Sequence, residues 1–141
     1  MRREPQAWQN RAMDRAAEPP SLARPGGVTY LHIPASEPAA LAVFYREVFG
    51  WGIRDEESSS PAFHDGSGHV IGHFVKEQEV AGDAGVRPYI YVEDVDATVQ
   101  EIANHGGWVV KEPFAEGALT VAVFADPAGN VLGVWRFGAP E

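Results

Sequence analysis

The first half of the chain shows hydrophobic patterns typical of strands and, between them, one typical of a helix. Residues 28–34 alternate in polarity as a strand does. Residues 37–49 instead place apolar side chains at helical spacing, at Leu41, Phe44, Tyr45 and Val48. Shorter runs with strand character follow at residues 52–54, 62–64 and 69–76. The pattern predicts a strand, a helix and three strands, in that order.

The same order recurs after a polar, glycine-containing linker at residues 77–85. Residues 94–105 have a helical pattern, and strand patterns occur at residues 87–92, 108–111, 119–125 and 131–137. The second half of the chain is therefore predicted to repeat the elements of the first half.

Short motifs support an internal duplication. The motif Asp65-x-x-Gly68-x-Val70-x-Gly72 returns 61 residues later as Asp126-x-x-Gly129-x-Val131-x-Gly133. The two predicted helices are offset by 57 residues, so the second half carries four extra residues before its last hairpin. We infer two copies of one strand–helix–strand–strand–strand unit.

Composition then narrows the possible chemistry. The chain has 11 Lys and Arg against 20 Asp and Glu, and it contains no Cys. The absence of Cys excludes disulfides, thiolate nucleophiles and Cys-based metal sites. The net charge of −9 disfavours nucleic-acid binding. There is no apolar run long enough to cross a membrane and no signal peptide, so we expect a soluble, cytoplasmic protein.

Residues 1–27 differ in character from the rest of the chain. Residues 6–17 are rich in helix-forming side chains, and Pro19 and Pro20 would stop a helix there. We expect a tail that is flexible or forms a short helix, followed by a domain at residues 28–137 and a short C-terminal tail at residues 138–141.

Several motifs resemble the vicinal oxygen chelate superfamily, which includes glyoxalase I, extradiol dioxygenases and bleomycin-resistance proteins. They are His32-Ile33-Pro34, FYREVFGW at residues 44–51, YVEDVDA at residues 91–97 and FADPAGN at residues 124–130. The resemblance implies an α+β fold of two βαβββ modules, at residues 28–76 and 86–137. Their strands would form a U-shaped mixed sheet around a ligand cleft.

The resemblance also implies where metal-using relatives hold their ion, on the first and last strands of each module. In this sequence those positions are Tyr30, Gly72, Arg87 and Gly133. A glycine has no side-chain donor, and a permanently charged Arg repels a divalent cation. We therefore expect no metal and no cofactor. Whether His32 or His73 rebuilds a metal site is left open by the sequence.

Strand alternation predicts which other side chains share the cleft face. The predicted ligand-binding residues are Tyr30, His32, Gly72, Phe74, Arg87, Tyr89, Tyr91, Gly133 and Trp135. His73 is expected on the opposite face, while Trp51 and Trp108, at matching repeat positions, are expected to pack structurally. Arg87 is expected to pair with Glu112 or Glu116 or, if neither reaches it, with an anionic or carbonyl-bearing ligand.

The favoured hypothesis is a metal-independent protein that binds an aromatic or amphipathic small molecule, for sequestration, resistance or sensing. The alternative is an enzyme of the superfamily, a lyase, isomerase or dioxygenase. It would use a relocated metal or acid–base chemistry by His32 and Tyr30. A third possibility is an accessory domain that acts through dimerisation. A homodimer is expected in any case, because open sheet edges need covering.

Overall fold

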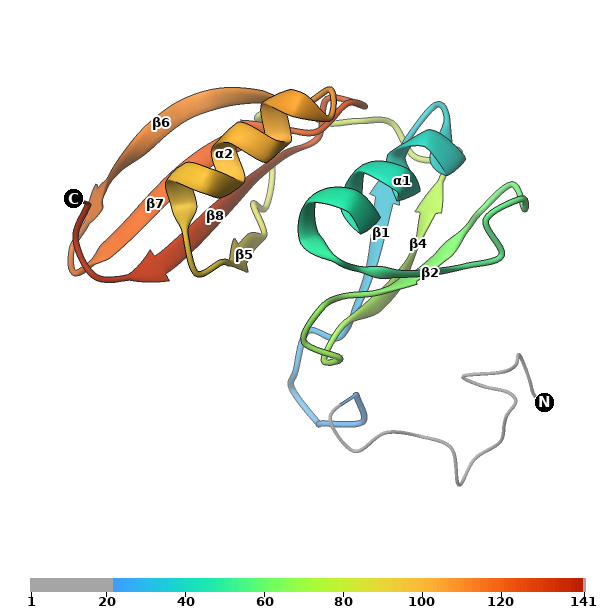
Figure 1. Ribbon diagram of the computed structural model, residues 1–141. Helices are drawn as coiled ribbons and strands as arrows, with labels where there is room; N and C mark the ends of the chain where they lie inside the picture. Colours follow the sequence, from blue (N-terminus) through green and yellow to red (C-terminus); the bar gives the residue numbers. More distant parts are fainter. Residues whose placement is uncertain (1–21, 141) are drawn as a thin grey trace.

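The computed structural model describes residues 22–140, and its elements follow the predicted order (Figure 1). Module one contains β1 (Tyr30–Pro34), α1 (Pro38–Phe49), β2 (Gly52–Arg54), β3 (Ala62–His64) and β4 (Ile71–Val75). Module two contains β5 (Tyr89–Tyr91), α2 (Val95–Asn104), β6 (Trp108–Glu116), β7 (Leu119–Ala125) and β8 (Val131–Phe137). Residues 1–21, where the tail or short helix was expected, lie outside the described residues.

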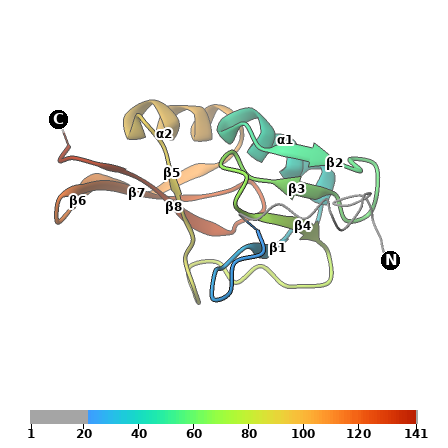
Figure 2. The ribbon, with the colours of Figure 1, turned by 90° about the horizontal axis from the view of Figure 1, so that it is seen from below.

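Each module forms one four-stranded mixed sheet, with orders β1-β4-β3-β2 and β5-β8-β7-β6. In both sheets the first and last strands of the module pair in parallel, and the other pairs are antiparallel. Figure 2 shows α1 and α2 beside each other on one side of the molecule, with the strands below them. The predicted α+β fold of two repeated βαβββ modules is confirmed.

Local sequence signals set the ends of the two helices. At α1, Gly50 adopts a left-handed φ of 73° and its N–H donates to the Arg46 carbonyl, which ends the helix. At α2, the Asp94 carboxylate accepts a 3.0 Å hydrogen bond from the Ala97 N–H, which caps the start. Among residues 22–140, no helix has the length and apolar character needed to span a membrane.

The strand β6 is longer than the sequence indicated, because residues 112–116 continue it past Lys111. The pairing of β6 with β7 shifts register between Val109 and Lys111 and again between Lys111 and Phe114. Such irregularities allow Pro113 to stand in a strand, and β6 lies at the edge of its sheet. The sequence pattern predicted this strand only over residues 108–111.

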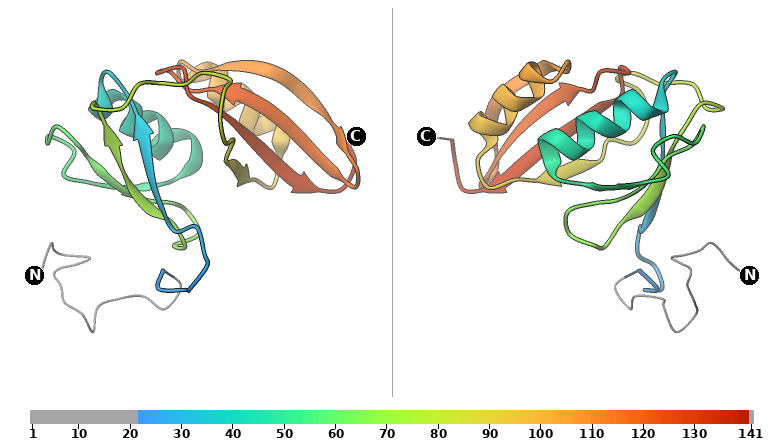
Figure 3. Two further views of the ribbon diagram at one scale, coloured as in Figure 1. Left: turned by 180° about the vertical axis from the view of Figure 1, so that it is seen from behind. Right: turned by 45° about the vertical axis from the view of Figure 1, so that its right-hand side comes forward.

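The two modules share one hydrophobic core. Phe124 of β7 lies 6.3 Å from the Phe44 ring and 5.7 Å from the Phe49 ring, measured between ring centroids. The core cluster extends from Ile33 of β1 to Val134 of β8. The modules therefore pack against each other through their helix-covered faces, and Figure 3 shows the segment between β4 and β5 crossing from one module to the other.

A buried polar cluster also joins the modules. The Tyr45 hydroxyl donates to Asp126 Oδ2 at 2.8 Å, and the Asn130 amide nitrogen donates to the Pro34 carbonyl at 2.8 Å. Burial raises the pKa of Asp126, against the effect of hydrogen bonds from Asn130, Tyr45 and the Ala128 N–H. Burial and the nearby Asp126 also raise the pKa of Tyr45. This cluster fixes the position of α1 relative to the last hairpin of module two.

Candidate functional site

An open pocket of about 1080 Å³ lies between the two modules. Module two contributes β5, the start of α2 and part of β8. Module one contributes the end of α1, the hairpin at residues 65–70, Leu31 of β1 and Val28, which precedes β1. The first strands, β1 and β5, belong to separate sheets and do not pair with each other, and the pocket lies between the modules at this place.

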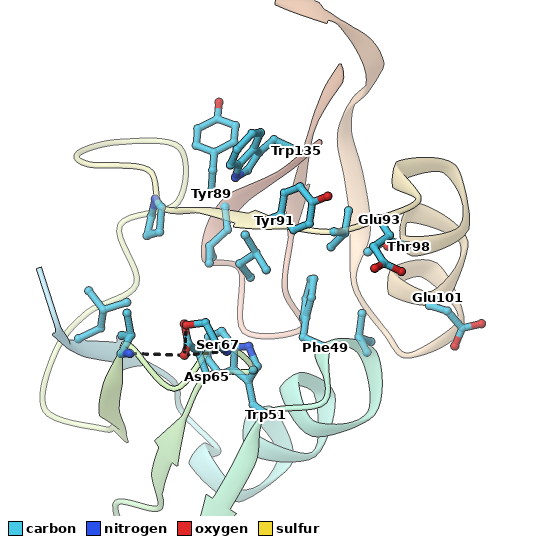
Figure 4. A pocket seen from close by; sticks show the side chains of 18 of the residues that line it. Phe49, Trp51, Asp65, Ser67, Tyr89, Tyr91, Glu93, Thr98, Glu101 and Trp135 are labelled. Atoms are coloured by element: carbon cyan, nitrogen blue, oxygen red, sulfur yellow. Dashed lines mark hydrogen bonds between the residues drawn. The ribbon is translucent and has the colours of Figure 1, made fainter. Parts of the chain in front are cut away.

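Aromatic side chains form two walls of this pocket. Figure 4 shows Tyr89, Tyr91 and Trp135 on one side, with Phe49 and Trp51 across from them. Tyr91 and Trp135 lie opposite each other in the β5–β8 register, and their ring centroids are 5.2 Å apart in an edge-to-face contact. The sequence predicted a shared face for Tyr89, Tyr91 and Trp135, and the structure brings them together.

Gly133 lies on the same face but beneath the aromatic wall. Tyr89 is its partner in the register, and a Cβ on Gly133 would come within 2.2 Å of the Tyr89 ring. Gly133 therefore allows this ring to lie close to β8, in agreement with the predicted face. Gly133 does not itself line the pocket.

The predicted face is wrong for Gly72 and Phe74. In the parallel pairing of β4 with β1, Gly72 lies opposite Leu31 and Phe74 lies opposite Ile33. Phe74 is fully buried beneath α1, and Gly72 lies under the ring of Phe63. Both belong to the hydrophobic core of module one and not to a ligand cleft.

A difference between the two hairpins explains this error. The Asp65 N–H donates to the carbonyl of Val70, whereas the Asp126 N–H donates to the carbonyl of Asn130. The turn in module one is thus one residue longer, although both turns share the Asp-x-x-Gly spacing. A shift of one residue exchanges the two faces of a strand.

The same shift moves His73 to the face where Tyr30 and His32 lie. Tyr30 Oη and His73 Nδ1 form a hydrogen bond of 2.8 Å, and His32 Nδ1 donates to Gln78 Oε1 at 3.1 Å. Burial, His32 and Arg54 lower the pKa of His73, and burial raises the pKa of Tyr30. The expectation that His73 faces the other way is wrong. These three side chains do not line the pocket between the modules.

Arg87 also lies outside the pocket lining. Its guanidinium forms an ion pair with the Asp83 carboxylate in the loop before β5. A hydrogen bond with the Tyr89 side chain and the Asp83 charge raise the pKa of Arg87. The sequence had offered Glu112 or Glu116 as partners, but the partner is Asp83. The expectation that Arg87 is free to bind an anionic ligand is therefore not supported by its position.

Trp51 and Trp108 differ in environment despite their matching positions. Trp51 is buried and stacks on Tyr45 and Phe63, with ring centroids 4.6 and 4.8 Å apart. It packs structurally, as expected, and also contributes to the pocket. Trp108 is 52% exposed on the edge strand β6, so its expected structural packing is not observed.

The residues at the implied metal positions do not fit a metal ion. In module two they are Arg87, which is ion-paired, and Gly133, which has no side-chain donor. In module one the nearest donors are Tyr30 and His73, and these are hydrogen-bonded to each other. Within residues 22–140, no three His, Cys, Asp or Glu side chains are grouped so that they could hold a metal ion. We derive no chemistry through a metal.

Comparison with known proteins identifies relatives of the whole domain. A family described as "Glyoxalase-like domain" matches residues 30–135. The anthracycline biosynthesis protein DnrV of Streptomyces peucetius is 27% identical, with 83% of this chain and 49% of DnrV covered. CFP32 of Mycobacterium tuberculosis, whose name proposes a glyoxylase, is 28% identical, with 80% of this chain and 46% of CFP32 covered. This chain spans about half the length of these relatives.

Solved structures support the same fold. A glyoxalase/bleomycin resistance protein/dioxygenase family enzyme from Burkholderia phytofirmans has a TM-score of 0.67 and 21% identity. The alignment covers 77% of this chain and 97% of that one. TioX from Micromonospora has a TM-score of 0.60 and 16% identity, and 79% and 99% of the two chains are covered. At these identities the likeness concerns the fold alone.

Proposed function

This chain belongs to the glyoxalase-like domain family, and we propose that it is a member that binds an aromatic or amphipathic small molecule in the pocket between its modules. The observation that carries the proposal is the pair of aromatic walls, with Tyr91 and Trp135 facing Phe49 and Trp51 (Figure 4). Aromatic side chains offer large apolar surfaces on which a flat ring can stack.

The placement of the candidate catalytic residues favours binding over catalysis in this pocket. Tyr30 and His32, the acid–base candidates of the enzymatic alternative, lie with His73 on a different surface. A general acid or base must reach the reacting atom within hydrogen-bond distance. The names of the relatives do not decide the matter, since one refers to anthracycline biosynthesis and another to a glyoxylase.

Binding can be tested with 9-(hydroxymethyl)anthracene, a neutral, flat and fluorescent probe. We expect the protein to bind it, and we expect Trp135→Leu to weaken binding by about fivefold or more, because a stacking surface is lost. The measurement is the anisotropy of the anthracene fluorescence, which does not depend on the protein's own tryptophans.

Trp108→Leu is the matched control, because Trp108 is exposed and lies outside the pocket. It should leave the affinity unchanged. If the probe does not bind, or if both variants weaken binding equally, the pocket is not the binding site that we propose.

We also propose that this function requires no metal. Purified protein should contain far less than one equivalent of transition metal, and added Ni²⁺ or Zn²⁺ should not raise its melting temperature. A tight site would stabilise the fold by linkage at saturating metal. One equivalent of metal by elemental analysis, lost in His32→Ala, would contradict this prediction and favour an enzyme with a relocated metal centre.

A further inference from the structure

We propose that the ligand of the pocket carries a positive charge, which Glu93 and Glu101 select. This inference rests on the proposed function, because it specifies the ligand of the same pocket. It starts from the charges that line the pocket: four carboxylates, from Asp65, Glu93, Asp94 and Glu101, and no Lys, Arg or His among the described lining residues.

The carboxylates of module two are gathered by the geometry of α2. Asp94, Thr98 and Glu101 follow the spacing of three and four residues that places side chains on one face of a helix, and all three line the pocket. Glu93 directly precedes the helix cap. Figure 4 shows Glu93 and Thr98 at the α2 side of the pocket, next to the ring of Tyr91, with Glu101 farther along α2 and away from that ring.

Two of the four carboxylates already serve the fold. Asp65 Oδ1 accepts hydrogen bonds from the N–H groups of Ser67 and Gly68, and Asp94 Oδ1 accepts one from the Ala97 N–H. Their negative charge is therefore partly compensated by these N–H donors. These two residues shape the pocket more than they select a ligand.

The other two carboxylates, of Glu93 and Glu101, form fewer or longer contacts with the protein. Glu101 has only long contacts, 3.5 Å to the Asn104 amide and 3.6 Å to the ring nitrogen of His105. The Glu93 carboxylate has no hydrogen bond or ion pair within residues 22–140. A cationic group on a ligand would give these two carboxylates a partner.

The aromatic walls favour the same charge. A cation within about 6 Å of an aromatic ring face is attracted by the ring, most strongly by tryptophan. Tyr91 lies next to Glu93 and contacts Trp135, so an ammonium group near Glu93 is also close to the Tyr91 ring (Figure 4). Arg87, the basic residue that the sequence placed in the cleft, is paired with Asp83 and does not line the pocket. An anionic ligand would be repelled by the four carboxylates of the lining.

The test uses three anthracenes of nearly equal size: 9-(aminomethyl)anthracene, 9-(hydroxymethyl)anthracene and anthracene-9-carboxylate. At pH 7 they are a cation, a neutral molecule and an anion. We expect the amine to bind tightest, about three- to tenfold more tightly than the alcohol, and the carboxylate to bind weakest. The advantage of the amine over the alcohol should shrink as salt is raised from low to about 0.5 M.

Single substitutions test which carboxylates favour the cationic ligand. Glu93→Gln and Glu101→Gln should each lower the affinity for the amine by about two- to fivefold and leave the affinity for the alcohol unchanged. Glu112→Gln removes the same charge from β6, outside the pocket, and should change neither affinity. This control separates a local effect from the effect of net charge.

The outcomes distinguish this inference from the proposed function. If all three anthracenes bind equally well, or if the carboxylate binds best, charge selection is wrong and the aromatic pocket stands. The same holds if Glu112→Gln weakens binding of the amine as much as Glu93→Gln does. If none of the three binds, the proposed function itself fails, and this inference fails with it.

Discussion

Replacing Asp126 by alanine is expected to lower the free energy of unfolding by about 3–5 kcal/mol, because several buried donors lose their acceptor together. The Tyr45 hydroxyl, the Asn130 side chain, and the Asn130 and Ala128 N–H groups all donate to this carboxylate at 2.8–3.0 Å. Asp126 is fully buried, so water cannot easily replace it. The expected loss of stability is smaller than the sum of four hydrogen bonds, because replacing Asp126 by alanine also removes the free-energy cost of burying its charge.

The chain provides its own control in Asp65, the matching residue of the first module. Asp65 also accepts hydrogen bonds from its turn, but the turn is largely exposed, and within residues 22–140 all hydrogen bonds to the Asp65 carboxylate come from residues 67–70. Asp65→Ala should therefore cost about 1 kcal/mol, typical of a lost exposed side-chain cap. Urea unfolding, monitored by circular dichroism, measures the free energy of unfolding of both variants. Equal losses in the two variants would show that Asp126 does not join the modules as described.

Gly72→Ala is expected to destabilise the protein by about 2–4 kcal/mol, since the core cannot accept the added methyl group without moving backbone. A Cβ at Gly72 would lie 2.0 Å from the Leu31 carbonyl oxygen and 2.6 Å from the ring of Phe63. The first is main chain of β1 and the second is a fully buried side chain. Relief of this overlap requires β4 to separate from β1.

Gly133→Ala is the matched comparison, because Gly133 occupies the repeated motif position in β8. The three atoms nearest to its added Cβ all belong to the ring of Tyr89, which is 40% exposed and can rotate away. We expect a loss of less than about 1 kcal/mol together with altered binding of 9-(hydroxymethyl)anthracene, because Tyr89 lines the pocket. Thermal unfolding and anisotropy measure the two effects. If Gly133→Ala is as destabilising as Gly72→Ala, the difference in register is wrong.

The sequence by itself determined the elements, their order and the duplication. Hydrophobic periodicity placed β2, β3, β7 and β8 at their observed bounds. Gly50 and Asp94 mark helix ends through hydrogen bonds to residues only three or four positions away in the chain. These features could be predicted because each depends on residues close together in the sequence. The face shared by Tyr89, Tyr91 and Trp135 followed from strand alternation alone.

Tertiary structure alone decided which residues meet. One additional residue in the turn after Asp65 exchanged the faces of β4, placing Gly72 in the core and His73 beside Tyr30, although the motif spacing was the same in both modules. A cleft was predicted, but the contributions of Trp51 and Glu93 to it were not, because these residues line one pocket only when the modules pack. Pairing register and packing between modules depend on contacts between residues far apart in the chain, and these leave no local periodic signal in one sequence.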